Sequence, residues 1–215
     1  MILSRLLKKR YLLSTGLLLG FYTIGLVGLC SPYQQQVLTL TPCILLITAG
    51  LLWGDHKPWR WPFVGFCGAA WVISFLVEVI GVHTGIIFGP YCYGTHLGWQ
   101  LWGVPVLIGL NWVVLVYAAG NIVSLLSVSN PIKCLIGALL VVLVDWLMEP
   151  VAVRLGFWQW AGNSIPTQNY VAWYVLAGGL LGLFYWVGKP SINPIAPVLY
   201  AVLLGFFGVL GLVIT

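Results

Sequence analysis

The chain has 215 residues, of which 6% are charged, whereas about 25% of the residues in an ordinary soluble domain carry charge. Hydrophobic residues make up 61% of the chain, and its mean hydropathy is +1.03. This composition excludes a disordered chain, and nine basic with four acidic residues cannot supply the polar surface of a soluble domain. We therefore expect a polytopic membrane protein.

Seven apolar segments approach the length of about 20 residues that a helix needs to cross a bilayer. Their apolar runs are continuous, which excludes a membrane β-barrel and predicts an all-α bundle forming one transmembrane domain over residues 1–215. The first segment follows a basic start, but its apolar run exceeds that of a leader and no A-x-A site follows, so we expect an uncleaved span. In chain order, the segments are 11–30, 37–53, 61–82, 101–120, 133–149, 169–187 and 195–215.

Lysine and arginine residues predict the orientation of the spans, because cytoplasmic loops carry the excess of positive charge. With seven spans, eight of the nine basic residues fall on the side of the N-terminus, and Arg154 alone falls on the other. We expect the cytoplasmic (inner) membrane, with the N-terminus in the cytoplasm and the C-terminus outside. The net charge of +5 reflects this orientation and does not indicate nucleic acid as a partner. The eight residues are Arg5, Lys8, Lys9, Arg10, Lys57, Arg60, Lys133 and Lys189.

Residues 71–187 contain a weak internal repeat. In each unit a span ends near a glutamate, an aromatic loop follows, and a return span carries a tryptophan. Such a parallel repeat would bring two similar clusters together around one pseudo-axis, which is a common place for a site. Chance matching within an apolar sequence is the alternative. Residues 78–85 match 149–156 in spacing, and 105–112 match 166–173.

Three of the four acidic residues, Glu78, Asp145 and Glu149, lie within apolar spans or at their ends. An ionised side chain costs about 2.5–3.5 kcal/mol at the centre of a membrane helix, so such residues indicate a function. The fourth, Asp55, lies in a polar loop, where we expect it to pair with a basic residue of the same loop.

Asp145 and Glu149 are four residues apart and therefore share one face of a helix. If both point into the bundle, desolvation and like-charge repulsion raise at least one pKa and leave a carboxylic acid protonated at neutral pH. General acid catalysis needs such a group. The alternative is structural, with Arg154 neutralising one carboxylate. Pro150 would mark a kink or the end of regular helix there.

Both outer loops are aromatic throughout. Aromatic faces bind a long, flat polyene and stabilise a passing carbocation, although an interfacial aromatic belt is the alternative. Asn111 and Asn169 lie on the return spans, where each would orient a water or bond to a neighbouring helix. The aromatic residues are Phe88, Tyr91, Tyr93, Trp99, Trp102, Phe157, Trp158, Trp160, Tyr170 and Trp173.

Several chemistries lack the residues that they need. Three histidines without an H-x-x-H pattern are too few for a di-iron membrane enzyme, and the last span has no lysine for a retinal Schiff base. The five cysteines have no metal-binding spacing, and no nucleotide motif occurs. We expect no metal and no cofactor.

Five motifs follow one another along the chain: Glu78–Gly94 (EVIGVHTGIIFGPYCYG), Gly103–Pro105, Asp145–Pro150 (DWLMEP), Gly156–Trp160 (GFWQW) and Pro166-x-x-Asn169-Tyr-x-x-Trp173. In this order they resemble the integral-membrane carotenoid hydratases, the acyclic carotenoid 1,2-hydratases that include the bisanhydrobacterioruberin hydratase type. The resemblance covers residues 70–187. The loop 161–165 is shorter than in the family, and Ala172 stands where the family often has glycine, which leaves the substrate open.

The resemblance implies an enzyme that adds water across the carbon 1–carbon 2 double bond of an acyclic carotenoid end. A carboxylic acid, Asp145 or Glu149, would protonate carbon 2, and water would capture the tertiary cation at carbon 1. Glu78 would accept the proton of that water, which Asn169 and His83 would place. The other expected substrate contacts are Tyr91, Tyr93, Asn111, Trp158, Trp160, Tyr170 and Trp173.

Two other functions stay open. A carotenoid cyclase or isomerase would form the same cation and quench it with an internal double bond. A proton-coupled or lipid transporter also uses intramembrane carboxylates. The expected partners are a polyene, the lipid bilayer and other enzymes of carotenoid biosynthesis.

Overall fold

The computed structural model describes residues 2–162, 164–187 and 192–214, and within them the chain forms eight helices and four short strands. The prediction of an all-α bundle is confirmed. The helices are α1 (Ile2–Leu29), α2 (Gln34–Leu38), α3 (Thr41–Gly54), α4 (Trp61–Thr84), α5 (Leu107–Ser124), α6 (Asn130–Arg154), α7 (Thr167–Val187) and α8 (Ile195–Ile214). The strands are β1 (Tyr91–Tyr93), β2 (Gln100–Leu101), β3 (Val104–Pro105) and β4 (Trp158–Trp160).

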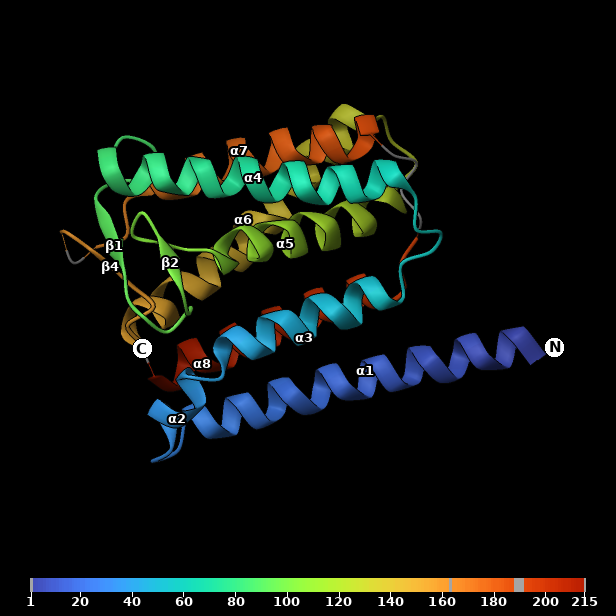
Figure 1. Ribbon diagram of the computed structural model, residues 1–215, viewed down its shortest axis with the longest axis horizontal. Coiled ribbons are helices and arrows are strands. Elements are labelled where there is room, and N and C mark those ends of the chain that lie inside the picture. Colours follow the sequence, from blue (N-terminus) through green and yellow to red (C-terminus); the bar gives the residue numbers. More distant parts are fainter. Residues whose placement is uncertain (1, 163, 188–191, 215) are drawn as a thin grey trace.

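The longer helices run back and forth along one direction, so the N- and C-termini lie at opposite ends of the bundle (Figure 1). We call the end with the four strands the strand end and the opposite end the loop end. Arg154 lies at the strand end, and Lys189 is outside the described residues. The described basic residues at the loop end are Lys9, Arg10, Lys57, Arg60 and Lys133.

Six described helices are long and apolar enough to cross a membrane, namely α1, α4, α5, α6, α7 and α8. The chain is therefore a multi-pass membrane protein. Helix α3 has 14 residues and rises about 21 Å, less than the roughly 30 Å of a bilayer core. The predicted segment 37–53 is divided because α2 ends at Leu38 and Pro42 lies in the first turn of the next helix, where proline is well tolerated.

Two other predicted boundaries differ from the structure. Helix α5 starts at Leu107 and not at residue 101, because Trp102 and Gly103 have positive φ angles of 53° and 75° and form the turn between β2 and β3. Helix α6 continues past Pro150 to Arg154, so this proline does not end the helix. Proline removes a single amide donor, and packed membrane helices tolerate that loss.

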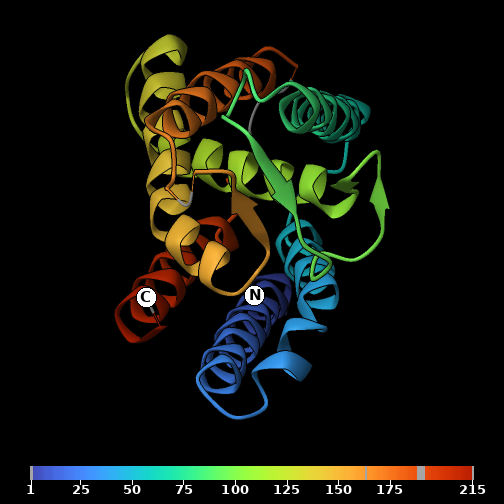
Figure 2. The ribbon, with the colours of Figure 1, turned by 90° about the vertical axis from the view of Figure 1, so that its left-hand side faces the viewer.

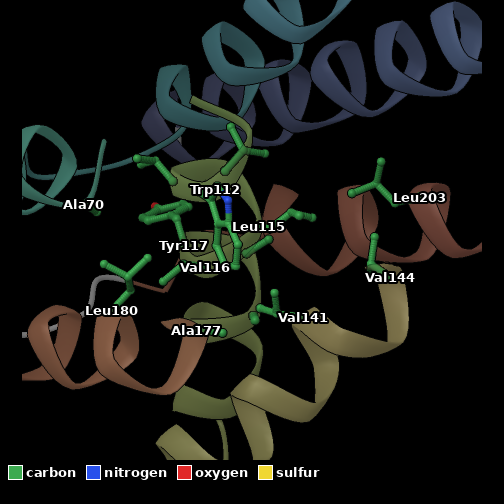
Figure 3. Close-up of a cluster of buried hydrophobic side chains, with 14 of the residues drawn as sticks. Ala70, Trp112, Leu115, Val116, Tyr117, Val141, Val144, Ala177, Leu180 and Leu203 are labelled. Atoms are coloured by element: carbon green, nitrogen blue, oxygen red, sulfur yellow. The ribbon is translucent and has the colours of Figure 1, made fainter. Parts of the chain in front are cut away.

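Helix α5 forms the centre of the bundle, where it contacts α3, α4, α6, α7 and α8. Its residues 112–121 are all buried, and Trp112 and Tyr117 are its largest enclosed side chains. The outer faces of the bundle stay apolar, as a lipid-facing surface requires. Figure 3 shows the core around α5, with Ala70, Trp112, Leu115, Val116, Tyr117, Val141, Val144, Ala177, Leu180 and Leu203 labelled.

The strand end joins the two units of the predicted repeat. Strand β1 of the first unit pairs antiparallel with β4 of the second, with Tyr91 opposite Trp160 and Tyr93 opposite Trp158 (Figure 2). Each strand follows a helix that a left-handed glycine terminates, Gly85 (φ 65°) after α4 and Gly156 (φ 74°) after α6. These equivalent positions match the repeat seen in the sequence.

Candidate active site

Glu78 lies near the end of α4 and is 3% exposed. Its carboxylate accepts hydrogen bonds from Tyr91 Oη (2.5 Å) and Tyr93 Oη (2.8 Å) at Oε2, and from Trp112 Nε1 (2.8 Å) at Oε1. Side chains alternate along a strand, so Tyr91 and Tyr93 project from the same face of β1. Three donors therefore converge on one buried carboxyl group.

Glu149 occupies the equivalent position on α6 and is 2% exposed. Its Oε2 accepts hydrogen bonds from Trp158 Nε1 and Trp160 Nε1, both at 3.0 Å, and its Oε1 accepts one from Asn169 Nδ2 at 3.2 Å. In both units, alternate aromatic residues of the following strand therefore bind the glutamate of the preceding helix. The antiparallel β1–β4 pair brings these two glutamates to one place.

The two units differ at Asp145 and Asn169. Asp145 is fully buried, and its Oδ2 accepts a hydrogen bond from Asn169 Nδ2 at 3.1 Å. Its Oδ1 has no hydrogen-bond partner among the described residues. By the spacing of the repeat, Ser74 replaces Asp145 in the first unit and bonds to its own helix at Ala70 O (2.8 Å), while Ile108 replaces Asn169. The bonded pair is therefore peculiar to the second unit.

Glu78 and Glu149 both line a small cavity at the strand end. The centre of a water molecule can lie within about 20 Å³ of this cavity, which is room for one water. Beside it, Trp112 and Trp173 stack with ring centroids 4.0 Å apart and an interplanar angle of 26°. The cavity is lined by Glu78, Phe88, Tyr91, Tyr93, Ile108, Glu149, Trp158, Trp160, Asn169 and Trp173.

A second cavity of about 340 Å³ lies between α1, α3, α5, α6 and α8 in the half of the bundle near the strand end. Its wall is almost entirely apolar, and it shares Ile108 and Trp158 with the small cavity. An apolar chamber thus adjoins the carboxyl groups. Asn111 and the hydrogen-bonded pair of Tyr22 and Thr48 (3.3 Å) are polar residues in its wall.

The electrostatic setting keeps the two tyrosines of β1 as neutral donors. Burial raises the pKa of Tyr91 and of Tyr93, and the negative charge of Glu78 raises the pKa of both further. Each hydroxyl therefore retains its proton at neutral pH and can donate a hydrogen bond to the Glu78 carboxylate.

Most of the residues predicted for the site lie together, but His83, Asn111, Arg154 and Tyr170 do not. His83 is exposed and its Nε2 lies 3.1 Å from Trp102 O, so it lines neither cavity. Tyr170 is half-buried and also lines neither cavity, and Asn111 lines the large cavity alone. The residues brought together are Glu78, Tyr91, Tyr93, Asp145, Glu149, Trp158, Trp160, Asn169 and Trp173.

The structure does not show the expected charge pairs. Arg154 is exposed and forms no ion pair with a described carboxylate. The ion pair found in the described part of the chain joins Arg10 Nε to Asp55 Oδ1 at 3.0 Å. The expectation that Asp55 pairs within its own loop is wrong, because α1 lies beside α3 and presents Arg10 and Ser14 to it.

Two site residues were not assigned roles from the sequence. Trp112 donates to Glu78, and Ile108 lines both cavities. The repeat contained the signal for Trp112, because this residue matches Trp173 in spacing. In the described part of the chain, no group of three or more His, Cys, Asp or Glu residues is arranged to hold a metal ion.

Comparison with known proteins assigns the family. The sequence profile of the family described as carotenoid biosynthesis protein matches residues 36–214. A bisanhydrobacterioruberin hydratase from Haloarcula japonica is 35% identical over 125 residues, which cover 54% of this chain and 42% of that protein. The match thus spans less than half of that relative, and no solved structure matches the chain. These matches confirm the resemblance predicted from the motifs, and the chain belongs to the family of carotenoid biosynthesis proteins.

Proposed function

We propose that this protein hydrates the carbon 1–carbon 2 double bond at an acyclic end of a carotenoid. Membership of the family and the similarity to a hydratase support this proposal. The observation that carries it is the position of Glu78 and Glu149, which line one water-sized cavity beside a large apolar chamber. A polyene end in the chamber would reach the carboxyl groups past Ile108 and Trp158.

In this proposal, Glu78 and Glu149 act as a pair that holds one proton. Two carboxylates that share a small, dry space do not both ionise readily, so one of them carries a proton. Each of the two glutamates accepts three hydrogen bonds, but those to Glu78 are shorter (2.5–2.8 Å) than those to Glu149 (3.0–3.2 Å). The anion is therefore better stabilised at Glu78, and we assign the proton to Glu149.

The reaction then has three steps. Glu149 transfers its proton to carbon 2, the carbon 1–carbon 2 π bond breaks, and a tertiary cation forms at carbon 1. The oxygen of the water in the small cavity bonds to carbon 1, and Glu78 takes the proton that this water loses. Proton return from Glu78 to Glu149 restores the starting state. No electrons are exchanged with a cofactor.

The aromatic residues around the cavity have two roles in the proposal. The indole N–H groups of Trp158 and Trp160 hold Glu149, while the ring faces of Trp158 and Trp173 offer negative quadrupoles to the cation. Among the described residues, Asp145 has one donor and its Oδ1 has no partner, so we assign it a neutral state in which it positions Asn169.

Room for one water favours hydration over cyclisation or isomerisation, since in those reactions an internal double bond, and not water, quenches the cation.

We also propose that the loop end lies in the cytoplasm and the strand end outside, because the described basic residues gather at the loop end. The active site would then lie near the outer surface of the cytoplasmic membrane.

Expression of the chain with acyclic carotenoids, followed by chromatography and mass measurement of the products, tests the proposal. We expect the mass of one water to be added, and Glu149→Gln and Glu78→Gln to lower the yield at least 100-fold. Asp55→Asn is the matched control, because Asp55 bonds to Arg10 and Ser14 at the loop end, and this variant should keep full yield. A product of unchanged mass would support the cyclase or isomerase, and full hydration by both glutamine variants would contradict the assigned roles.

A further inference from the structure

Asn111 lies on α5 and lines the large apolar cavity, on the helix face that also presents Ile108, Val114 and Leu115 to it. It is half-buried, and its amide makes no hydrogen bond to any residue in the described part of the chain. The buried asparagines behave differently. Asn121 donates to Tyr117 O (2.9 Å), Asn169 donates to Asp145 and Glu149, and Asn193 donates to Leu52 O (2.6 Å). Asn111 is therefore an amide in an apolar chamber without a partner among the described residues.

Asn111 lies close to the place where the reacting end of a bound molecule would lie. Ile108, which lines both cavities, is three residues earlier on α5. Residues three apart share a helix face and are separated by a rise of about 4.5 Å. Asn111 therefore lies about one helical turn deeper in the large cavity than the junction with the carboxyl groups.

An amide that faces an apolar cavity has lost hydrogen bonds to water, and a hydrocarbon ligand offers no hydrogen bond in their place. A ligand that carries an oxygen atom at the same depth restores the lost hydrogen bond. An amide suits either common form of such an oxygen, because its NH₂ group donates to a keto oxygen and its carbonyl accepts from a hydroxyl. Discrimination against a ligand without the polar group is strong where a site is built to bond it.

We propose that Asn111 is a specificity residue that hydrogen-bonds a hydroxyl or keto oxygen on the polyene, close to its reacting end. The preferred substrate is then an acyclic polyene with an oxygen substituent, and the unsubstituted hydrocarbon is a poorer one. This inference rests on the proposed function for the identity of the ligand, but binding tests it separately from catalysis.

Binding is measured with the purified full chain in detergent, by quenching of tryptophan fluorescence. The probes are an acyclic hydrocarbon polyene and polyenes of the same length with one hydroxyl or one keto group near the end. We expect an oxygenated probe to bind about 10-fold more tightly than the hydrocarbon, and Asn111→Leu to abolish this preference. Asn130→Leu is the matched control, because Asn130 is exposed at the start of α6 and lines neither cavity, and its replacement leaves the preference unchanged.

Turnover of the same probes completes the test. Asn111→Leu should lower kcat/KM for the oxygenated substrate about 10-fold and leave that for the hydrocarbon unchanged or raised. An equal loss for both substrates would overturn the inference and indicate that Asn111 holds the reacting water or a neighbouring helix. Equal binding of all probes by the unaltered chain would also overturn it. If the binding preference depends on Asn111 but no substrate gains water, the proposed function fails and the recognition of oxygen stands.

Discussion

Asn169 donates one amide nitrogen to two carboxyl groups, to Asp145 Oδ2 at 3.1 Å and to Glu149 Oε1 at 3.2 Å. The two acids lie one turn apart on α6, and Asn169 reaches them from the first turn of α7. This bridge fixes the side chain of Glu149 from the side opposite to Trp158 and Trp160, which bind its other oxygen. The orientation of the proposed acid therefore depends on a residue of a different helix.

Replacement of Asn169 should impair turnover more than folding. We expect Asn169→Leu to lower kcat for hydration at least 10-fold, because Glu149 loses one of its three donors and Asp145 loses its single described donor. Gln168→Ala is the matched control, since Gln168 is the preceding amide on α7 and bonds instead to Ile86 O and Ile87 O. Steady-state kinetics in detergent give the comparison, and equal kinetics for both variants would refute the role of the bridge.

The tyrosines of β1 should make the stability of the fold depend on alkaline pH. Burial and Glu78 raise the pKa of Tyr93 above the value of about 10 that it has in the unfolded chain. Its contribution to the free energy of unfolding is therefore complete below pH 10 and declines as the pH rises above 10, by about 1.4 kcal/mol per pH unit for one proton. Tyr91 follows the same sign.

Thermal unfolding between pH 8 and pH 12 tests this expectation. Tyr93→Phe should be less stable than the unaltered chain at pH 8, because Glu78 loses a donor, and its stability should fall less steeply above pH 10. Parallel curves for the two proteins over the whole range would show that Tyr93 does not contribute to the pH dependence.

Gly94 joins the two units and should tolerate no side chain. Its amide donates to Phe157 O at 2.8 Å, and a Cβ atom on it would overlap the carbonyl oxygen of Gly156. We expect Gly94→Ala to lower the free energy of unfolding by about 1–3 kcal/mol and to displace β1 from β4, with loss of activity. Gly68→Ala on α4 is the control, because a Cβ there meets no atom within 4 Å, and it should unfold like the unaltered chain. Similar unfolding of the two variants would contradict this account.

The orientation in the membrane can be measured with cysteine labelling. Cys92 is exposed on β1 at the strand end, and Ser127 is exposed in the connection between α5 and α6 at the loop end. In chains with a single cysteine, a membrane-impermeant maleimide should label Cys92 in intact spheroplasts, and Ser127→Cys only after permeabilisation. The reverse pattern would invert the proposed orientation.

The sequence predicted the helices and the burial of Glu78, Asp145 and Glu149 well, because both signals are local. Continuous apolar runs indicate helices in a membrane, and carboxyl groups are conspicuous where charge is rare. Hydropathy did not detect the turn at Trp102 and Gly103, since the turn directly precedes the apolar run that starts at Val104 and continues into α5. The sequence also could not predict the partner of Asp55, because Arg10 is 45 residues away in the chain.

The misplaced residues His83 and Arg154 have a common cause. Each follows a glutamate by five residues, and at 3.6 residues per turn this spacing turns the side chain about 140° away from the glutamate. His83 and Arg154 are both exposed, whereas Glu78 and Glu149 are buried. Closeness in the sequence suggested a shared site, but the helical period already placed these side chains on different faces.

The volume of the small cavity has a consequence for the fate of the proposed cation. A tertiary cation can be captured by water or can lose a proton and return to the alkene, and the same acid serves both directions. The small cavity has room for about one water, so at most one water molecule is available to react with the cation after each protonation. Protonations that occur while the cavity is dry regenerate the starting alkene. The ratio of alcohol formed to alkene returned would then measure how often the small cavity holds a water molecule, and this ratio would vary with the water activity of the medium.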